Sequence, residues 1–201
     1  MTTEELLEKM TKVLPGNRAH KSFSPLRNFK MDTSEFKKAA VALHLKIQHK
    51  KLHLILIKRT AYNGAHSQQI AFPGGKFEQK DKDLEYTARR ESFEEIGIPT
   101  DTGLFIGKLS EVLIPVSSFR VTPFVFLHKK YPDLIKEQRE VQEILICELK
   151  ELDTFKLKTF ENVEARKGLL LNNVPGLHFK EHFIWGATAL MLHEFNTLLR
   201  E

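Results

Sequence analysis

The feature that most constrains this chain is a short helical run that carries three carboxylates just before a glycine. It lies in residues 72–98, FPGGKFEQKDKDLEYTARRESFEEIGI. At about 100° per residue, Glu91, Glu94 and Glu95 fall within one arc of roughly 100° on a helix. Like charges at this spacing repel one another, and a divalent cation would convert the repulsion into coordination. Because Mg²⁺ and Mn²⁺ prefer oxygen ligands, the run predicts a metal site suited to phosphate chemistry.

The residues that flank the carboxylates support a helix that ends beside them. Asp83 is a suitable N-cap and Gly97 a suitable C-terminal stop, so we expect a helix over residues 83–96. Within it, Arg90 is spaced to hold Glu94 as an i,i+4 ion pair.

Two glycines precede the predicted helix. Gly74 and Gly75 have no side chains and would let the backbone approach a ligand closely. A solvated acidic face is the commoner meaning of a charge run on a helix. The glycines, the arginine and the acids in one register favour the metal site over that alternative.

The remainder of the chain predicts a mixture of helices and strands. Apolar periodicity predicts further helices at residues 3–14 and 183–199. Runs rich in Val, Ile and Leu predict strands at residues 38–47, 51–59, 69–72, 104–114, 119–128 and 140–149, the first two forming a hairpin. We divide the chain into an N-terminal helix and arm, 1–35, and a main domain, 36–201.

Composition excludes several classes of protein. Hydrophobic residues make up 41% and charged residues 28%, a mixture typical of globular domains. The net charge of +5 is spread along the chain, which suits an anionic substrate and gives no signal for nucleic acid. The single cysteine, Cys147, cannot form an intrachain disulfide. No signal peptide and no apolar stretch of about 20 residues is apparent, so we expect a cytoplasmic location and no membrane partner.

Residues 72–98 resemble the Nudix box, G-x5-E-x7-R-E-U-x-E-E-x-G-U, in which U is apolar. The matching residues are Arg90, Glu91, Glu94, Glu95, Gly97 and Ile98. The chain departs from the pattern in two ways. The segment from Gly75 to Arg90 is one residue longer, with Asp81 near the place of the first Glu, and Ser92 stands where an apolar residue is usual. The longer spacing is typical of the coenzyme A pyrophosphatase branch.

A second motif of that branch, L-L-T-x-R-S-x3-R-x-H-x-G-Q-x-A-F-P-G-G, resembles the upstream sequence ILIKRTAYNGAHSQQIAFPGG. The matching residues are Ile55, Leu56, Arg59, His66, Gln69, Ala71, Phe72, Pro73, Gly74 and Gly75. Gly64 replaces the second Arg of the motif and Gln68 replaces its Gly. With FIWGATALML near the C-terminus, the resemblance covers roughly residues 36–198.

The resemblance implies the fold and the reaction. The implied fold is of the α+β class: the Nudix fold, a three-layer α/β/α sandwich with a mixed β-sheet. The implied reaction is metal-dependent hydrolysis of the diphosphate of coenzyme A or its derivatives, which gives 3′,5′-ADP and a 4′-phosphopantetheine.

The resemblance also implies a role for each matching residue. Mg²⁺ or Mn²⁺ would be held by Glu91, Glu94, Glu95 and the carbonyl of Gly74. Arg90 would orient the acids, and the general base would be a box residue such as Glu91 or a loop acid such as Glu140. The substrate-binding candidates are Arg59, His66, Gln69, Gly75 and Lys76.

Several readings remain open at this stage. One is a Nudix hydrolase that acts on ADP-ribose or a dinucleotide, and another is a Nudix domain that only binds a nucleotide. Glu143 is a second acid beside the strand at 140–149, whereas His178 and His182 carry no evident role. Trp185 is expected in the core of the last helix. Whether two chains form a homodimer is also open.

Overall fold

The computed structural model describes residues 1–21, 35–61, 68–166 and 168–201. Its α-helices are α1 (Thr3–Met10), α2 (Asn17–His20), α3 (Leu84–Ile96) and α4 (Gly186–Arg200). Its strands are β1 (Lys37–Gln48), β2 (Lys51–Arg59), β3 (Ile70–Ala71), β4 (Gly74–Lys76), β5 (Leu104–Lys108), β6 (Val112–Ile114), β7 (Phe119–His128), β8 (Val141–Glu148), β9 (Lys158–Phe160), β10 (Val163–Arg166), β11 (Leu169–Leu171), β12 (Val174–Phe179) and β13 (His182–Trp185). Short 3₁₀ turns occur at η2 (Pro115–Ser117), η3 (Leu149–Glu151) and η4 (Thr154–Lys156).

Strands β1 to β8 form one mixed sheet. Its central path runs β3-β2-β1-β7-β5, while β4 pairs with β1, β6 with β7 and β8 with β2. The pair β1–β7 is parallel and the other pairs are antiparallel. The β1–β2 hairpin and β7 confirm the strands that the apolar runs predict at 38–47, 51–59 and 119–128.

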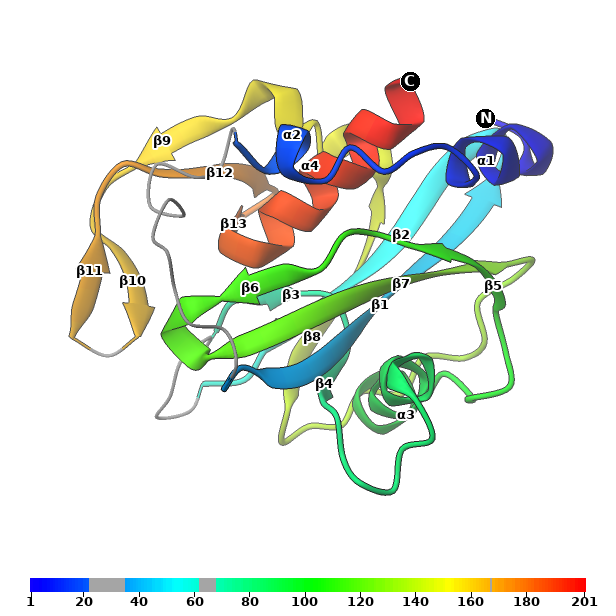
Figure 1. Ribbon diagram of the computed structural model, residues 1–201, viewed down its shortest axis with the longest axis horizontal. Helices are drawn as coiled ribbons and strands as arrows, with labels where there is room; N and C mark the ends of the chain where they lie inside the picture. The colour runs from blue at the N-terminus through cyan, green and yellow to red at the C-terminus, as the bar shows by residue number, and fades with distance from the viewer. Residues whose placement is uncertain (22–34, 62–67, 167) are drawn as a thin grey trace.

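Helices cover both faces of this sheet, as Figure 1 shows, with α3 on one side and α1, α2 and α4 on the other. The alternation of side chains along β1 explains the two layers. Ala40 and Ala42 pack against Ala88 of α3, and their small side chains bring the helix close to the sheet. Leu43 and Leu45 point the other way, into the core cluster that includes α4. The three-layer α+β sandwich expected from the sequence is confirmed.

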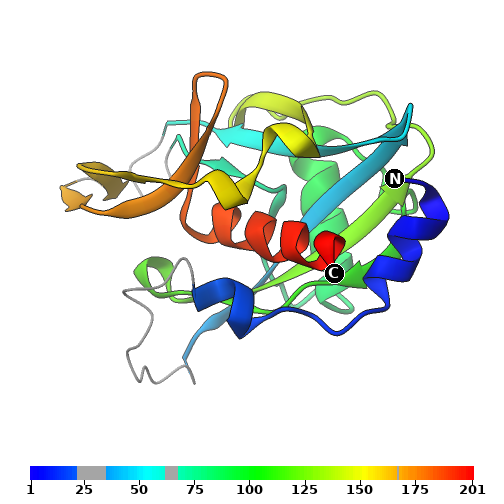
Figure 2. The same cartoon turned by 90° about the horizontal axis from the view of Figure 1, so that it is seen from above.

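The C-terminal third of the chain extends the molecule beyond the main sheet. Strands β9, β12 and β13 form a three-stranded sheet, and β10 and β11 form a separate hairpin. Figure 2 shows this extension at the opposite end of the molecule from α1. At the other terminus, Leu6 and Met10 of α1 are buried in the same core cluster as α4. The boundary at residues 35/36 remains a prediction.

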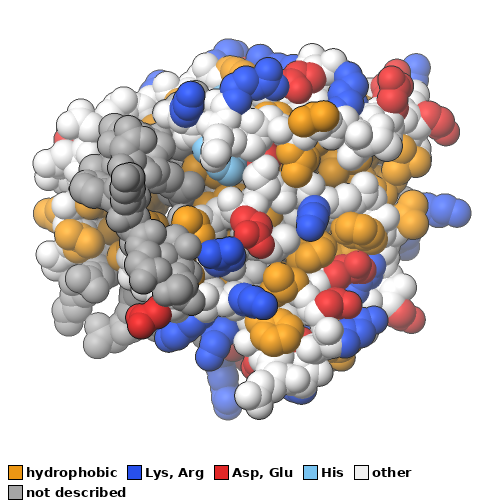
Figure 3. All heavy atoms as spheres, viewed as in Figure 1, with side chains coloured by type: hydrophobic (Ala, Val, Ile, Leu, Met, Phe, Trp, Pro, Cys, Tyr) orange, Lys and Arg blue, Asp and Glu red, His pale blue; other side chains and the backbone are white. Residues whose placement is uncertain are grey.

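The surface carries no concentration of one charge on the face that Figure 3 displays. Acidic and basic side chains are interspersed there, with apolar side chains between them. Within the described ranges, none of the helices has the length and apolar character needed to cross a membrane.

Three predicted elements differ from the structure. The first helix ends at Met10 rather than at residue 14, because the N–H groups of Thr11 and Lys12 donate to carbonyls three residues back, which tightens the last turn. The strand predicted at 104–114 is split into β5 and β6, since the backbone N–H of Ser110 donates to Glu194 of α4 instead of a neighbouring strand.

The third difference lies at the start of the last helix. The helix predicted at 183–199 begins only at Gly186, and the residues before it form β13, paired with β12. The reason is a period-two burial pattern from His182 to Trp185, which is that of a strand. Trp185 is therefore half-buried at the end of a strand rather than inside a helix.

A buried polar chain ties α3 to the centre of the sheet. The imidazole of His44, on β1, lies 2.8 Å from the hydroxyl of Ser92 and 2.9 Å from the imidazole of His128. Burial lowers the pKa of His44 well below its usual value and lowers the pKa of His128 to about 4, so both rings are neutral at pH 7. Ser92, which departs from the Nudix pattern, thus has a hydrogen-bonding role inside the core.

We predict that Ser92→Ala lowers the free energy of unfolding by about 1–3 kcal/mol, because a buried nitrogen of His44 loses its partner. Urea denaturation would measure the change. Combining the substitution with His44→Leu gives a double-mutant cycle. A Ser92→Ala loss of the same size in the His44→Leu background would contradict the assignment.

Candidate active site

The helix that carries the acids has well-defined ends. The side chain of Asp83 accepts a hydrogen bond from the Tyr86 N–H and caps the start of α3. Gly97 ends the helix with φ of 74°, a left-handed conformation that glycine adopts without strain. The predicted helix bounds, N-cap and stop are therefore confirmed.

Arg90 is the centre of a buried hydrogen-bond network. Its guanidinium donates to both oxygens of Asp81, at 2.8 and 2.9 Å. One nitrogen, Nη1, donates to Glu91 and to Glu94, each at 2.8 Å, and Nη2 donates to the carbonyl of Lys76. The hydrogen bonds from Arg90 hold the pKa of Asp81 well below its usual value.

The role of Asp81 goes further than its position near the first Glu of the box suggested. Asp81 is 4% exposed, and its carboxylate also accepts hydrogen bonds from the Thr87 hydroxyl and the Glu78 N–H. Asp81 thus fixes the turn before α3 and the orientation of Arg90 together. The sequence signal for this role was the presence of an acidic residue near the place of the first Glu of the box.

Glu95 is the most deeply buried of the three acids on the helix. Its Oε1 accepts from the guanidinium of Arg59 at 3.1 Å, and its Oε2 accepts from the N–H of Gly74 at 2.8 Å. Burial raises the pKa of Glu95 to about 8, and Arg59 and Gly74 oppose the shift. Arg59, expected at the substrate, therefore also positions Glu95, a contact that nothing in the sequence indicated.

Gly74 and Gly75 lie so close to neighbouring atoms that neither position has room for a Cβ. A Cβ at Gly75 would lie 2.5 Å from the carboxylate of Glu91, and a Cβ at Gly74 would lie 2.4 Å from the carbonyl oxygen of Ala40. The pairing of β4 with β1 brings this turn to the helix. Gly75 thus lies directly against an acid of the helix and Gly74 against β1, while the predicted close approach to a ligand stays a prediction.

Glu140 lies in a loop that is fastened to both sides of the site. The N–H of Glu137 donates to the carbonyl of Glu95, and the carbonyl of Glu140 accepts from the N–H of Thr60. The charge of Glu140 contributes to raising the pKa values of Glu91 and Glu95, after burial as the main cause. Glu143, in contrast, lies beside His182 on the outer part of β8.

A cavity of about 840 Å³ opens beside the glycines. Arg59, Gln69, Gly74, Gly75 and Lys76 line the end that adjoins the acids. Most of the remaining wall is apolar and comes from β1, β6, β7, the C-terminal extension and the start of α4; it includes Val41, Ile114, Leu171, Val174, Trp185 and Met191.

Four of the five predicted substrate residues thus share one cavity wall, while His66 and Gly64 fall outside the described residues. Gln68, which replaces a glycine of the motif, has φ of 58°. This left-handed conformation explains why glycine suits that position. Trp185, expected in the core, lines the cavity instead.

The acids fit a divalent cation by charge and by available oxygens. Four carboxylates meet only two guanidinium groups, so the fully ionised network keeps two negative charges. Arg90 engages one oxygen of Glu91 and one of Glu94, which leaves the second oxygen of each carboxylate for a metal. Oxygen donors of this kind suit Mg²⁺ or Mn²⁺.

The chain was compared with protein families and curated proteins. Residues 36–169 match the family described as NUDIX domain. Two similar relatives are each described as an uncharacterized Nudix hydrolase NudL. The protein of Pectobacterium atrosepticum is 32% identical over 79% of this chain and 80% of its own length. The protein of Photorhabdus laumondii is 33% identical over 78% of this chain and 81% of its own length.

Solved structures with the same fold were also found. A NUDIX hydrolase from Alicyclobacillus acidocaldarius has a TM-score of 0.51 at 16% identity and covers 60% of this chain and 82% of that chain. A MutT/nudix family protein from Enterococcus faecalis has a TM-score of 0.51 at 12% identity and covers 100% of this chain and 76% of that chain. At these identities the likeness concerns the fold alone.

We predict that metal binding releases a proton from Glu95. Because its pKa is raised to about 8, the carboxyl is largely protonated at pH 7 and must ionise to bind a cation. The apparent affinity for Mn²⁺ should therefore rise with pH and level off above about pH 8. Isothermal titration calorimetry between pH 6 and 9 would measure it.

Two variants on the same helix serve as test and control. Glu95→Gln should weaken Mn²⁺ binding and flatten the rise between pH 6.5 and 8. Glu85→Gln changes an acid that pairs with Arg89, away from the network, and should keep the wild-type slope. A wild-type affinity that does not change over this range would overturn the assignment.

Proposed function

The chain belongs to the Nudix hydrolase family, and on this premise we propose that it hydrolyses the diphosphate bond of coenzyme A or its derivatives, giving 3′,5′-ADP and a 4′-phosphopantetheine. One observation carries the proposal: the acidic network lies at the end of a large cavity whose other walls are mainly apolar. The diphosphate would lie at the acids and the glycines. The long, weakly polar pantetheine arm would occupy the apolar part.

The apolar wall favours this substrate over ADP-ribose. The second half of ADP-ribose is a sugar with several hydroxyls, and each buried hydroxyl without a partner costs free energy. A pantetheine arm carries amides separated by methylene groups and ends in a thiol or thioester. Its apolar segments would gain about 25 cal/mol per Å² of buried surface along residues such as Val174 and Met191.

The residues of the network have separate roles in the proposed reaction. Glu91, Glu94 and Glu95, with the carbonyl of Gly74, would hold Mg²⁺ or Mn²⁺. The bound cation would neutralise phosphate oxygens and lower the pKa of a water molecule. Arg90 keeps Glu91 and Glu94 at fixed positions on the helix surface.

Other residues would act on the substrate or on protons. Arg59 holds Glu95 from the cavity side, and Gln69 and Lys76 line the part of the cavity where the diphosphate would bind. Glu140 is close enough for its charge to act on Glu91 and Glu95, which makes it a candidate acceptor of the proton from water.

We expect hydrolysis to require a divalent cation and to prefer coenzyme A derivatives. Protein treated with a chelator should be inactive and should recover with Mg²⁺ or Mn²⁺. A panel of coenzyme A, its disulfide, acyl derivatives, ADP-ribose, NADH and diadenosine phosphates would rank kcat/KM. Full activity without metal would refute the mechanism, and a clear preference for ADP-ribose would refute the substrate.

Two further variants distinguish a loss of catalysis from a loss of substrate recognition. Glu94→Gln should lower kcat by at least about 100-fold on every substrate, because stabilisation of charge in the transition state is lost. Gln69→Ala should lower kcat/KM for coenzyme A by roughly fivefold to tenfold, the effect of one hydrogen bond, and affect ADP-ribose less. Glu85→Gln is the matched control and should remain active. Equal effects of Gln69→Ala on both substrates would remove Gln69 from recognition.

A further inference from the structure

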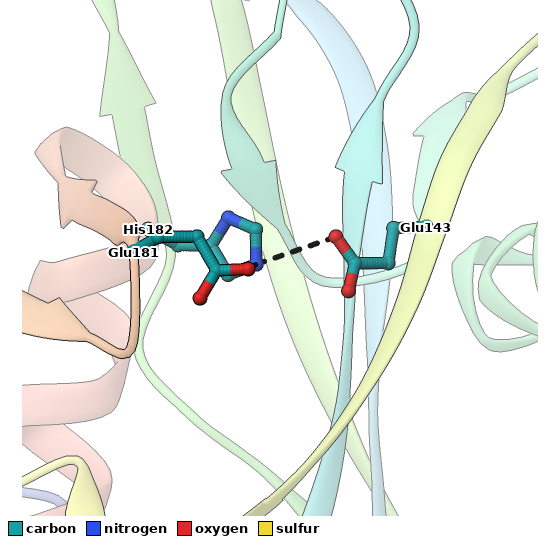
Figure 4. Close-up of side chains that lie close together, drawn as sticks. All are labelled: Glu143, Glu181 and His182. Carbon is teal, nitrogen blue, oxygen red and sulfur yellow. Dashed lines mark ion pairs between the residues drawn. The ribbon is translucent and has the colours of Figure 1, made fainter.

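A second group of metal-ligating side chains lies outside the acidic network. It consists of Glu143 on β8, Glu181 in the turn between β12 and β13, and His182 at the start of β13. One donor atom from each residue lies within 4.8 Å of the other two. Figure 4 shows the imidazole of His182 directed across the gap between the two strands toward Glu143.

One nitrogen of the buried imidazole of His182 lacks a hydrogen-bond partner in the part of the molecule that the structure describes. The side chain of His182 is 4% exposed, and its Nε2 has no hydrogen-bond partner among the described residues. A buried ring nitrogen in this state costs free energy unless something binds it. It points at two carboxylates instead, from Glu143 and Glu181, which are 44% and 73% exposed on their side chains.

The two distances from His182 lie within ion-pair range and match the spacing of two ligands of one ion. Nε2 of His182 lies 3.3 Å from the carboxylate of Glu143 and 3.6 Å from that of Glu181. A charge-assisted hydrogen bond would be about 2.7–2.9 Å long. In a tetrahedral zinc site, with bonds of about 2.0–2.1 Å to nitrogen and oxygen, the ligand atoms stand about 3.3–3.4 Å apart.

The two carboxylates of the cluster have no close basic side chain in the described ranges, although Lys58 is the cross-strand partner of Glu143. Within the described part of the chain, no lysine or arginine lies within 4.0 Å of either carboxylate. One imidazole and two carboxylates form a donor set of mixed nitrogen and oxygen. Imidazole suits zinc and similar transition ions, whereas Mg²⁺ prefers oxygen alone, so this set differs in chemistry from the acids of α3.

We propose that Glu143, Glu181 and His182 form a binding site for Zn²⁺, with water completing the coordination from the exposed side. The ion joins β8 of the main sheet to the β12–β13 hairpin. That hairpin supplies Val174 and Trp185 to the wall of the cavity. Bound zinc therefore fastens one wall of the substrate cavity to the sheet, a structural role separate from hydrolysis.

Equilibrium dialysis of the full chain against Zn²⁺, with excess Mg²⁺ to occupy the oxygen-only site, tests the proposal. Zinc content would be measured by mass spectrometry. We expect one zinc per chain, and His182→Ala should weaken zinc binding at least about tenfold. Because His182 is buried, Glu143→Gln provides a second variant at a half-exposed position and should weaken binding similarly.

Two controls keep the result specific. His178→Ala removes an exposed histidine of the same hairpin and should leave zinc binding unchanged. Glu94→Gln should lower hydrolysis by at least about 100-fold and leave zinc binding unchanged. Hydrogen exchange should slow in residues 174–185 on adding zinc to the wild type, and not in Glu143→Gln.

Either of two results would overturn the site. One is the absence of zinc binding by the wild type in excess Mg²⁺. The other is zinc binding that Glu143→Gln and His182→Ala leave as tight as in the His178→Ala control. Both are independent of activity toward coenzyme A.

Discussion

The buried guanidinium of Arg90 is the interaction on which the candidate active site depends. A buried charge is tolerated only when its partners replace water, and Arg90 has Asp81, Glu91, Glu94 and the carbonyl of Lys76. The bidentate contact with Asp81 fixes the plane of the guanidinium. That plane in turn fixes the positions of Glu91 and Glu94 on the helix surface, whereas Glu95 is held by Arg59 and the N–H of Gly74.

The site combines two environments that distant segments build. Helix α3 and the turn before it supply charge, while the apolar wall comes both from the main sheet and from the C-terminal extension and α4. The two meet near Gly74 and Gly75, which line the cavity, and the absence of a side chain lets Gly75 lie against the carboxylate of Glu91. A diphosphate joined to a weakly polar arm is the kind of molecule that such a junction accommodates.

The sequence predicted the parts of this site whose causes are local. The cap at Asp83, the stop at Gly97 and the register of the acids are contained in a few neighbouring residues, and the structure has them. The contact of Arg59 with Glu95 joins residues 36 positions apart, and no periodicity encodes it. The strand before α4 was missed for a related reason: an apolar run fits either a strand or a helix until its neighbours are known. The hydroxyl of Ser92 contacts His44 on β1, so the reason for a polar residue at this position is visible only in the folded structure.

The parallel pairing of β1 with β7 has a consequence for how the chain acquires its structure. The pair joins residues 37–46 to residues 119–128, so the middle of the sheet cannot form until both segments have been made. Closing so long a stretch of chain costs entropy before any contact is gained, which slows folding. Helix α3 lies between β1 and β7 in the sequence, so its residues are synthesised before those of β7. The layer in which α3 packs against β1 and β7 is therefore completed only after residue 128 has been made.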